Sequence, residues 1–136
     1  AQATRRRAGQ AGQKRPMNAA ALPATLVTGA SAAVREAAIA ASLGQGVTAA
    51  AILEGLPDPR SILAASDSLE VHRIAPGCVC CTGNLVLRVT LNRVLRGRPA
   101  RLFIGLANTE HLDQLRSWLQ HPPYDQLLEL TPDLRT

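Results

Sequence analysis

Residues 24–44, ATLVTGASAAVREAAIAASLG, decide the fold of this chain. Ala24 to Thr28 is a short apolar run that stops at Gly29, the pattern of a buried strand that ends in a turn. Ala32 to Leu43 is an alanine-rich stretch with helical periodicity, and Gly44 follows it as a helix stop. The order strand, turn, helix predicts an α/β architecture.

The rest of the chain continues this alternation. Val47 to Leu53 is uninterrupted and apolar, which is typical of a strand buried on both faces. Further strands are predicted at Leu69 to Ile74, Ala100 to Ala107 and Asp125 to Leu130. Helical segments are predicted at Ser61 to Ala65 and at Leu85 to Arg96, where Gly97 stops the helix. Another helix is predicted after Asn108, where Leu112, Leu115 and Leu119 recur at helical spacing. These elements predict a three-layer α/β domain with a mainly parallel sheet of about five strands, in which Val47 to Leu53 and Leu102 to Ala107 are central and buried. The loops that follow the strands then form the functional edge.

All three cysteines of the chain lie in residues 77–84, GCVCCTGN, between a predicted strand and a predicted helix. Thiolates bind soft and borderline metal ions, so Cys78, Cys80 and Cys81 predict a site for one zinc-like or cuprous ion. Asn84 is a candidate N-cap, and the positive end of the helix that follows it favours the thiolate form. A redox site and three small buried side chains are the alternative interpretations.

A tetrahedral metal site needs a fourth ligand from outside this loop. Glu54 ends a predicted strand at the same edge, where a solvated glutamate is the simpler interpretation. His111 falls in the first turn of the helix after Asn108, also at that edge, where an exposed residue at the helix start is the simpler interpretation. His72 precedes Cys78 by six residues on an extended strand, which places it farther from the loop than the other two candidates.

The segment from Gly77 to Thr82 resembles the G-C-x-C-C-[ST] signature of the CobW-type P-loop GTPases. The resemblance covers residues 24 to about 130 and corresponds to the front part of the family's GTPase domain. It implies a P-loop NTPase-like fold whose cysteine loop follows the third strand and is implicated in metal binding. It also implies a role in metal trafficking and in cobalamin or zinc homeostasis.

The phosphate-binding motif expected from this resemblance is altered. A P-loop reads G-x-x-x-x-G-K-[ST], because its glycines let backbone N–H groups cradle phosphates while the lysine and the hydroxyl serve the phosphates and magnesium. Here Gly29 is followed by Val34 at the second glycine, Arg35 at the lysine and Glu36 at the hydroxyl. We interpret Gly29 and Arg35 as relics of a nucleotide site.

Other nucleotide-binding elements of the family also differ in this chain. Gly105 and Asn108 stand where the family has the acid and the glycine of an E-x-x-G motif. Leu53 replaces the asparagine of an Asn-Glu pair, which leaves Glu54 alone, and no N-K-x-D stretch is present to read guanine. We therefore expect GTP and ATP to bind weakly or not at all.

Residues 1–17 are polar and basic, and they predict a disordered tail before an α/β domain at residues 18–136. The tail holds five of the chain's fifteen lysines and arginines and no acid, so the remainder is balanced in charge. Arg5 to Arg7 could touch nucleic acid or begin an export signal, but stacking aromatics are lacking and Pro23 interrupts the apolar stretch that follows. Met17 offers an alternative natural start. We expect a cytoplasmic protein with no nucleic-acid or membrane partner.

These observations predict a zinc-like metal-binding protein of the accessory or metal-handling class, with nucleotide motifs degraded from those of CobW-type GTPases. Its expected partners are a metal ion and a client or partner protein. One alternative is an active GTP-binding and GTP-hydrolysing metallochaperone that works with Arg35 in place of lysine. The other is a thiol redox or structural module, which metal analysis of the reduced protein would distinguish.

Overall fold

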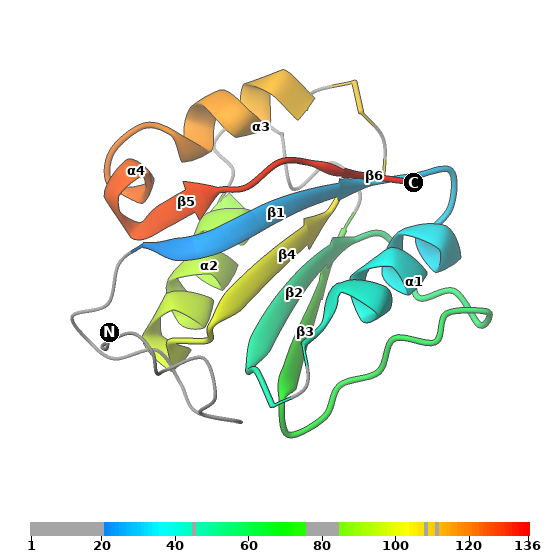
Figure 1. Ribbon diagram of the computed structural model, residues 1–136. Coiled ribbons are helices and arrows are strands. Elements are labelled where there is room, and N and C mark those ends of the chain that lie inside the picture. The colour runs from blue at the N-terminus through cyan, green and yellow to red at the C-terminus, as the bar shows by residue number, and fades with distance from the viewer. Residues whose placement is uncertain (1–20, 45, 76–84, 108, 111) are drawn as a thin grey trace.

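A computed structural model describes residues 21–44, 46–75, 85–107, 109–110 and 112–136. Within these residues a six-stranded sheet is flanked by helices (Figure 1). The elements in chain order are β1 (Leu22–Thr28), α1 (Ala32–Ser42), β2 (Ala49–Glu54), β3 (Leu69–Ile74), α2 (Leu85–Gly97), β4 (Arg101–Gly105), α3 (Leu112–Leu119), α4 (Tyr124–Leu127), β5 (Leu128–Leu130) and β6 (Leu134–Arg135). The predicted α/β class with a mainly parallel sheet is confirmed.

The strands are ordered β3-β2-β4-β1-β5, and every described pairing between these strands is parallel. β6 also pairs with β1, farther along it than β5, so that Leu22 lies opposite Leu128 and Val27 lies opposite Leu134. The N–H of Thr131 donates to the carbonyl of Ala24 between these two pairings. β5 and β6 therefore act as one interrupted edge strand beside β1.

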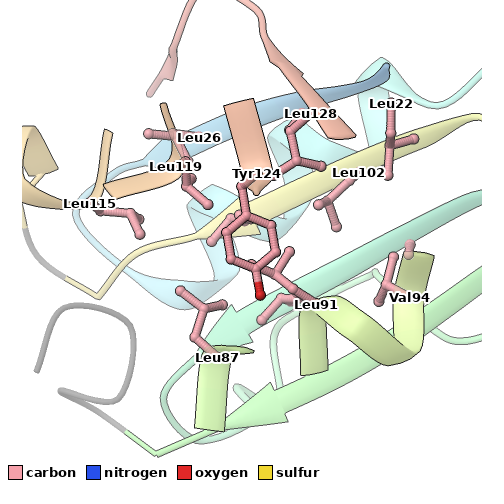
Figure 2. Close-up of a cluster of buried hydrophobic side chains, with 14 of the residues drawn as sticks. Leu22, Leu26, Leu87, Leu91, Val94, Leu102, Leu115, Leu119, Tyr124 and Leu128 are labelled. Atoms are coloured by element: carbon pink, nitrogen blue, oxygen red, sulfur yellow. The ribbon is translucent and has the colours of Figure 1, made fainter. Parts of the chain in front are cut away.

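The helices cover the two faces of the sheet unequally. α1 packs on one face with Ile39, Phe103 and the odd-numbered residues of β2, whereas α2, α3 and α4 pack on the other (Figure 1). Figure 2 shows this second, larger cluster, which joins leucines from the strands to side chains from all three helices. Its labelled members are Leu22, Leu26, Leu87, Leu91, Val94, Leu102, Leu115, Leu119, Tyr124 and Leu128. The result is the three-layer arrangement predicted from the alternating runs.

Both strands predicted to be central are central and buried. β2 lies between β3 and β4, and all six of its residues are buried. Alternate residues of a strand point to opposite faces, so Ala50 and Ile52 enter the larger cluster while Ala51 and Leu53 enter the smaller one. β4 lies between β2 and β1 and is likewise buried from Leu102 onward. A continuous apolar run is therefore the correct pattern for these positions.

Several predicted boundaries were wrong. Residues 61–65 form no helical turn, because the Ser61 hydroxyl bonds to Glu36 and accepts from the N–H of Leu63, which replaces helical backbone bonding. The strand predicted at Asp125 to Leu130 begins only at Leu128, after the short helix α4. Helix α2 includes Gly97 and ends before Arg98, which takes the left-handed conformation with φ 51°.

Some predictions fall on residues outside the described ranges. These are the tail at residues 1–17, the N-cap roles of Asn84 and Asn108, and the cysteine loop itself. Among the helices that are described, none combines the length and the apolar character that crossing a membrane requires.

Candidate functional site

The carboxyl ends of the parallel strands meet at one edge of the sheet, as the functional-edge prediction requires. The helix after β1 covers one face of the sheet and the helix after β4 covers the other, so the topological switch lies between these neighbouring strands. Gly29 follows β1 and Ala107 lies just after β4, which places both at this switch. Open α/β sheets bind ligands at such a point.

Glu54 joins two strand ends at this edge. Its side-chain oxygen Oε1 accepts a hydrogen bond of 2.8 Å from the backbone N–H of Ala107. The residue is only 6% exposed, so the interpretation as a solvated glutamate was wrong. A buried carboxylate that accepts a backbone N–H is instead a structural tie, and here it joins the end of β2 to the segment after β4.

The strand that precedes the cysteine loop, β3, ends beside Glu54. In the register of β2 and β3, Glu54 lies opposite Ile74, and the N–H of Gly55 donates to the carbonyl of Ile74 over 2.8 Å. Residues 76–84, which include Cys78, Cys80 and Cys81, lie outside the described ranges, and α2 begins directly after them at Leu85. The chain therefore enters the cysteine loop next to the buried carboxylate.

Of the two histidine candidates for the fourth ligand, His72 lies within the described ranges and His111 does not. His72 lies opposite Ile52, two residues before the end of β3, and its Nε2 is 3.0 Å from Oε2 of Glu70. His111 lies outside the described ranges, just before α3. Among the described residues, histidines, cysteines and carboxylates form no group of three or more that could hold a metal ion. The structure thus places the His72 ring beside Glu70, with Nε2 making no hydrogen bond to any described residue.

The structure brings the two predicted relics of a nucleotide site together. Arg35 is buried in α1, and its Nη1 donates a 2.9 Å hydrogen bond to the carbonyl of Gly29. Burial lowers the pKa of Arg35, although the negative charges of Glu36 and Glu54 act to raise it. The guanidinium is therefore directed at its own turn and lies within electrostatic reach of the buried edge carboxylate.

Glu36 forms an ion pair that the sequence pattern did not reveal. Arg73 of β3 donates to both carboxylate oxygens of Glu36, over 2.9 and 3.1 Å, and the Ser61 hydroxyl donates to Oε1. Burial on its own would raise the pKa of Glu36, but the hydrogen bonds from Arg73 and Ser61 and the nearby arginine charges lower it. The acid at the position of the P-loop hydroxyl is thus engaged in holding α1 to β3 and to the loop after β2.

The structural role of Asp58 was also not predicted, although its sequence context indicated a turn. It lies between two prolines and two residues before Arg60, a setting typical of a side chain that bonds to the backbone ahead of it. Its carboxylate accepts from the Arg60 backbone N–H at 2.9 Å and from the Arg60 guanidinium at 3.1 and 3.2 Å. The bonds from Arg60 are the largest causes that lower the pKa of Asp58, and the backbone N–H of Ala33 in α1 adds a smaller one. An acid from a distant loop therefore lies near the first turn of this helix.

The start of α1 is capped by a side chain of the turn before it. The Ser31 hydroxyl accepts from the N–H of Val34 over 3.2 Å. Thr136 lies over the preceding turn, where its N–H and hydroxyl both donate to the carbonyl of Thr28. A Cβ on Gly29 would approach the Thr136 hydroxyl to 2.0 Å, so this turn is closely packed.

Comparison with known proteins gives an informative match. The chain is 36% identical over 75 residues to the zinc chaperone YeiR of Escherichia coli (strain K12). The match spans 54% of this chain and 23% of that protein, so the chain corresponds to about a quarter of the relative's length. No family model and no solved structure matches the chain. The similarity covers about half of the chain and supports the CobW-like resemblance over that part.

Proposed function

We propose that this protein binds a transition-metal ion, zinc in the first instance, through Cys78, Cys80 and Cys81 and serves as a metal-handling accessory protein. The observation that carries the proposal is the similarity to a zinc chaperone, taken together with three cysteines in four consecutive positions. A thiolate set of this kind suits zinc or a cuprous ion. In this role the metal is cargo, which the protein passes to a client.

The position of the cysteine loop in the fold supports this proposal. The loop connects the carboxyl end of β3 to α2, at the edge where open α/β sheets bind ligands. Ile74, at the end of β3 before the loop, pairs in register with the buried Glu54. To act as a fourth ligand, Glu54 would have to share its carboxylate with the N–H of Ala107. His111, at the start of α3, is the other candidate ligand.

Nucleotide turnover is not part of the proposed function. The N–H of Val34 is engaged by the Ser31 hydroxyl, and Arg35 donates to the carbonyl of Gly29. Phosphate binding would require these bonds to be exchanged, and a hydrogen bond to a charged group is worth about 1.5–3 kcal/mol. We therefore expect GTP affinity to be weak, and a low-micromolar Kd for Mg-GTP by calorimetry would favour the GTPase alternative.

The deciding experiment measures metal stoichiometry. The full chain is purified without oxygen, reduced, loaded with zinc and dialysed, and the bound zinc is measured by mass spectrometry. We expect one zinc per chain in the parent and little in a variant with Cys80→Ser and Cys81→Ser. Ser66→Ala and Ser68→Ala together provide a control that alters two side chains on another loop of the same domain.

Ligand candidates are then separated with matched variants. His111→Ala is compared with His121→Ala, which alters an exposed histidine after α3 whose Nδ1 donates to the carbonyl of Ser117 over 2.6 Å. Glu54→Gln is compared with Glu70→Gln. Substitution of a true fourth ligand should lower zinc affinity by about 10-fold or more, whereas the control substitution should leave the affinity unchanged. Absence of zinc from the reduced parent would refute the metal proposal and favour the redox or structural alternative.

A further inference from the structure

We propose that the outer edge of β3 pairs with β3 of a second copy of this chain, so that the sheets of two copies join antiparallel across a two-fold axis. The inference concerns an interaction surface and goes beyond the proposed metal-handling function. It depends on the backbone groups that this edge leaves open, on the spacing of those groups, and on two polar side chains beside them.

β3 is an end strand of the sheet, because β2 is the only described strand that pairs with it (Figure 1). The carbonyls of Ser68 and Ile74 face β2, where they accept from the N–H groups of Ala49 and Gly55. Backbone groups of successive strand residues point to alternate sides. The odd-numbered residues of β3 therefore direct their N–H and carbonyl groups away from the sheet, as an edge strand does.

This outer edge is closed at its start and open beyond it. Leu69 exchanges two backbone hydrogen bonds with Ser66, over 2.9 and 3.2 Å, so its outward groups are satisfied within the chain. The outward N–H and carbonyl groups of Val71 and Arg73 make no hydrogen bond to any described residue. Open backbone groups thus stand on a pair of residues that lie two positions apart.

That spacing is self-complementary. With His72 on a two-fold axis perpendicular to the sheet, Val71 of each copy lies opposite Arg73 of the other. Residues opposed in this way exchange both N–H···O bonds in an antiparallel ladder, so the open groups of both copies are all satisfied. An axis at Val71 instead would bring Leu69 opposite Arg73 and require the bonds between Leu69 and Ser66 to be broken. The open groups therefore select one register.

The side chains beside the axis fit this register. Glu70 lies on the α2 face, where its Oε1 is 3.9 Å from the place of a Cβ on Gly97, and His72 shares that face by alternation. The Glu70 side chain is 48% exposed, and Nε2 of His72 makes no hydrogen bond to any described residue. Diagonal neighbours on one face of an antiparallel pair lie about 7–8 Å apart, within reach of long side chains. Glu70 of each copy can therefore accept from the imidazole of His72 in the other.

The pairing closes on itself and needs no metal. A two-fold contact uses the same patch on both copies, so it ends at a dimer. The paired segment is short, which makes the dimer weak and dependent on protein concentration. The chain leaves the ends of the paired β3 strands in opposite directions on its way to the two cysteine loops, so no zinc ion has to be shared.

The test is sedimentation equilibrium of the full chain with reductant and chelator present, so that neither disulfides nor zinc can join the copies. We expect the mass to rise from that of a monomer toward that of a dimer as the protein concentration reaches the millimolar range. Hydrogen exchange at the Val71 and Arg73 amides, followed by NMR, should slow by about 10-fold where about nine-tenths of the chains are paired, because only the unpaired fraction exchanges.

Variants of the edge separate this contact from other associations. Val71→Pro removes an outward N–H from an edge strand, where proline is tolerated, and His72→Asp places like charges opposite each other. Because the axis repeats each change, we expect the dimer to weaken by about 10-fold or more. His121→Asp, the same substitution at an exposed histidine after α3, is the matched control and should behave as the parent. Circular dichroism checks folding, and His72→Asp decides if the proline variant does not fold.

The expected register also has a direct readout. In a mixture of labelled and unlabelled chains, an isotope-filtered NOE should join the Hα protons of His72 in the two copies, because these lie opposite each other without hydrogen bonds. An NOE between the Hα protons of Glu70 and His72 would move the axis to Val71 and overturn the register.

Three other outcomes would refute the pairing. These are a mass that stays monomeric, equal weakening by His121→Asp, and slow exchange at Val71 and Arg73 in the monomer, which would show that another segment of the chain covers this edge. Zinc stoichiometry is measured separately, so failure of the metal proposal is distinguished from failure of the dimer.

Discussion

Arg73 on β3 and Glu36 on α1 form a two-bond ion pair, with N–O distances of 2.9 and 3.1 Å, across one face of the sheet. The Glu36 side chain is only 3% exposed, whereas Arg73 is partly open to solvent. Removing the arginine would therefore leave a buried carboxylate that keeps its hydrogen bond from Ser61 but loses both bonds from the guanidinium. An unpaired buried charge costs more than the pair contributes when it is intact.

We expect Arg73→Met to lower the free energy of unfolding by about 2 kcal/mol. This value is at the lower end of the range for breaking a hydrogen-bonded charge pair, because Arg73 is partly exposed. Chemical denaturation at neutral pH measures the change. Arg60→Met is the control, because Arg60 is largely exposed and should shift the denaturation midpoint little. The double variant Arg73→Met, Glu36→Gln should recover part of the loss, and additive effects of the two changes would contradict a coupled pair.

Stability should fall in acid because the fold lowers several carboxylate pKa values. The pKa of Asp133 is lowered by its hydrogen bond from Arg116, that of Asp58 by its bond from Arg60, and that of Glu36 by Arg73 and Ser61 despite burial. A carboxylate with a depressed folded pKa stabilises the fold above its unfolded pKa of about 4, and this contribution is lost as the pH falls further. Denaturation midpoints measured between pH 7 and pH 3 should therefore drop below about pH 4.5. Glu36→Gln should show a shallower drop, and a parallel profile would exclude Glu36 as a contributor.

The bond between Glu54 and Ala107 predicts a graded response to substitution. Glu54→Ala leaves the Ala107 N–H without this acceptor and should cost about 1–3 kcal/mol. Glu54→Gln retains a carbonyl oxygen and should cost less. Thermal unfolding compares these with Glu70→Ala, which alters a half-exposed glutamate on β3. Equal losses in Glu54→Ala and Glu70→Ala would show that the strand-end tie contributes little.

Helix α2 provides a test of the larger core cluster. Leu91 is completely buried, so Leu91→Ala should lower the free energy of unfolding by about 2–5 kcal/mol through lost burial and a residual cavity. Val89 lies two residues earlier on the same helix and is 50% exposed, so Val89→Ala should cost under about 0.5 kcal/mol. Urea denaturation of both variants checks the difference, and similar losses would contradict the orientation of α2.

Removing the metal should leave the domain folded. The described members of the two apolar clusters come from the strands, the helices and the loop after β2, and this burial is enough for us to expect that the core persists without the metal. We expect a chelator to release bound zinc while the far-ultraviolet circular dichroism and the cooperative thermal transition remain. Zinc affinity should decrease as the pH falls, since protons compete for the thiolates. Unfolding on chelation would instead identify the metal as a structural component.

The sequence predicts the regular part of this fold well, because burial on both faces leaves a visible apolar run. Leu69 to Ile74 coincides with β3, and the run at Val47 to Leu53 identifies β2 to within two residues at its start. The irregular part depends on contacts that local patterns do not encode. Ser61 leaves helical geometry for a bond to a glutamate 25 positions away, which no local periodicity could indicate.

The shared edge of the strand ends was predicted for the same reason. The parallel topology places Gly29, Glu54 and the carboxyl end of β3 at one end of the sheet, as the alternation of strands and helices predicts. The partners of the individual side chains do not follow from it. The sequence around Arg73 is that of an ordinary strand, yet Arg73 pairs with Glu36 at a separation of 37 positions. Glu54 likewise accepts from the N–H of Ala107, which follows β4 at a separation of 53 positions.

The place of β1 in the sheet bears on how the chain is made. Among the described strands β1 is synthesised first, but both of its neighbours, β4 and the interrupted edge strand at residues 128–135, are synthesised much later. Until then both edges of β1 carry unpaired backbone groups, and such edges invite pairing with other chains. β2 and β3, in contrast, can pair as soon as residue 74 has emerged. Nascent chains should therefore acquire a β2–β3 seed first and depend on chaperones to shield β1 until its distant partners arrive.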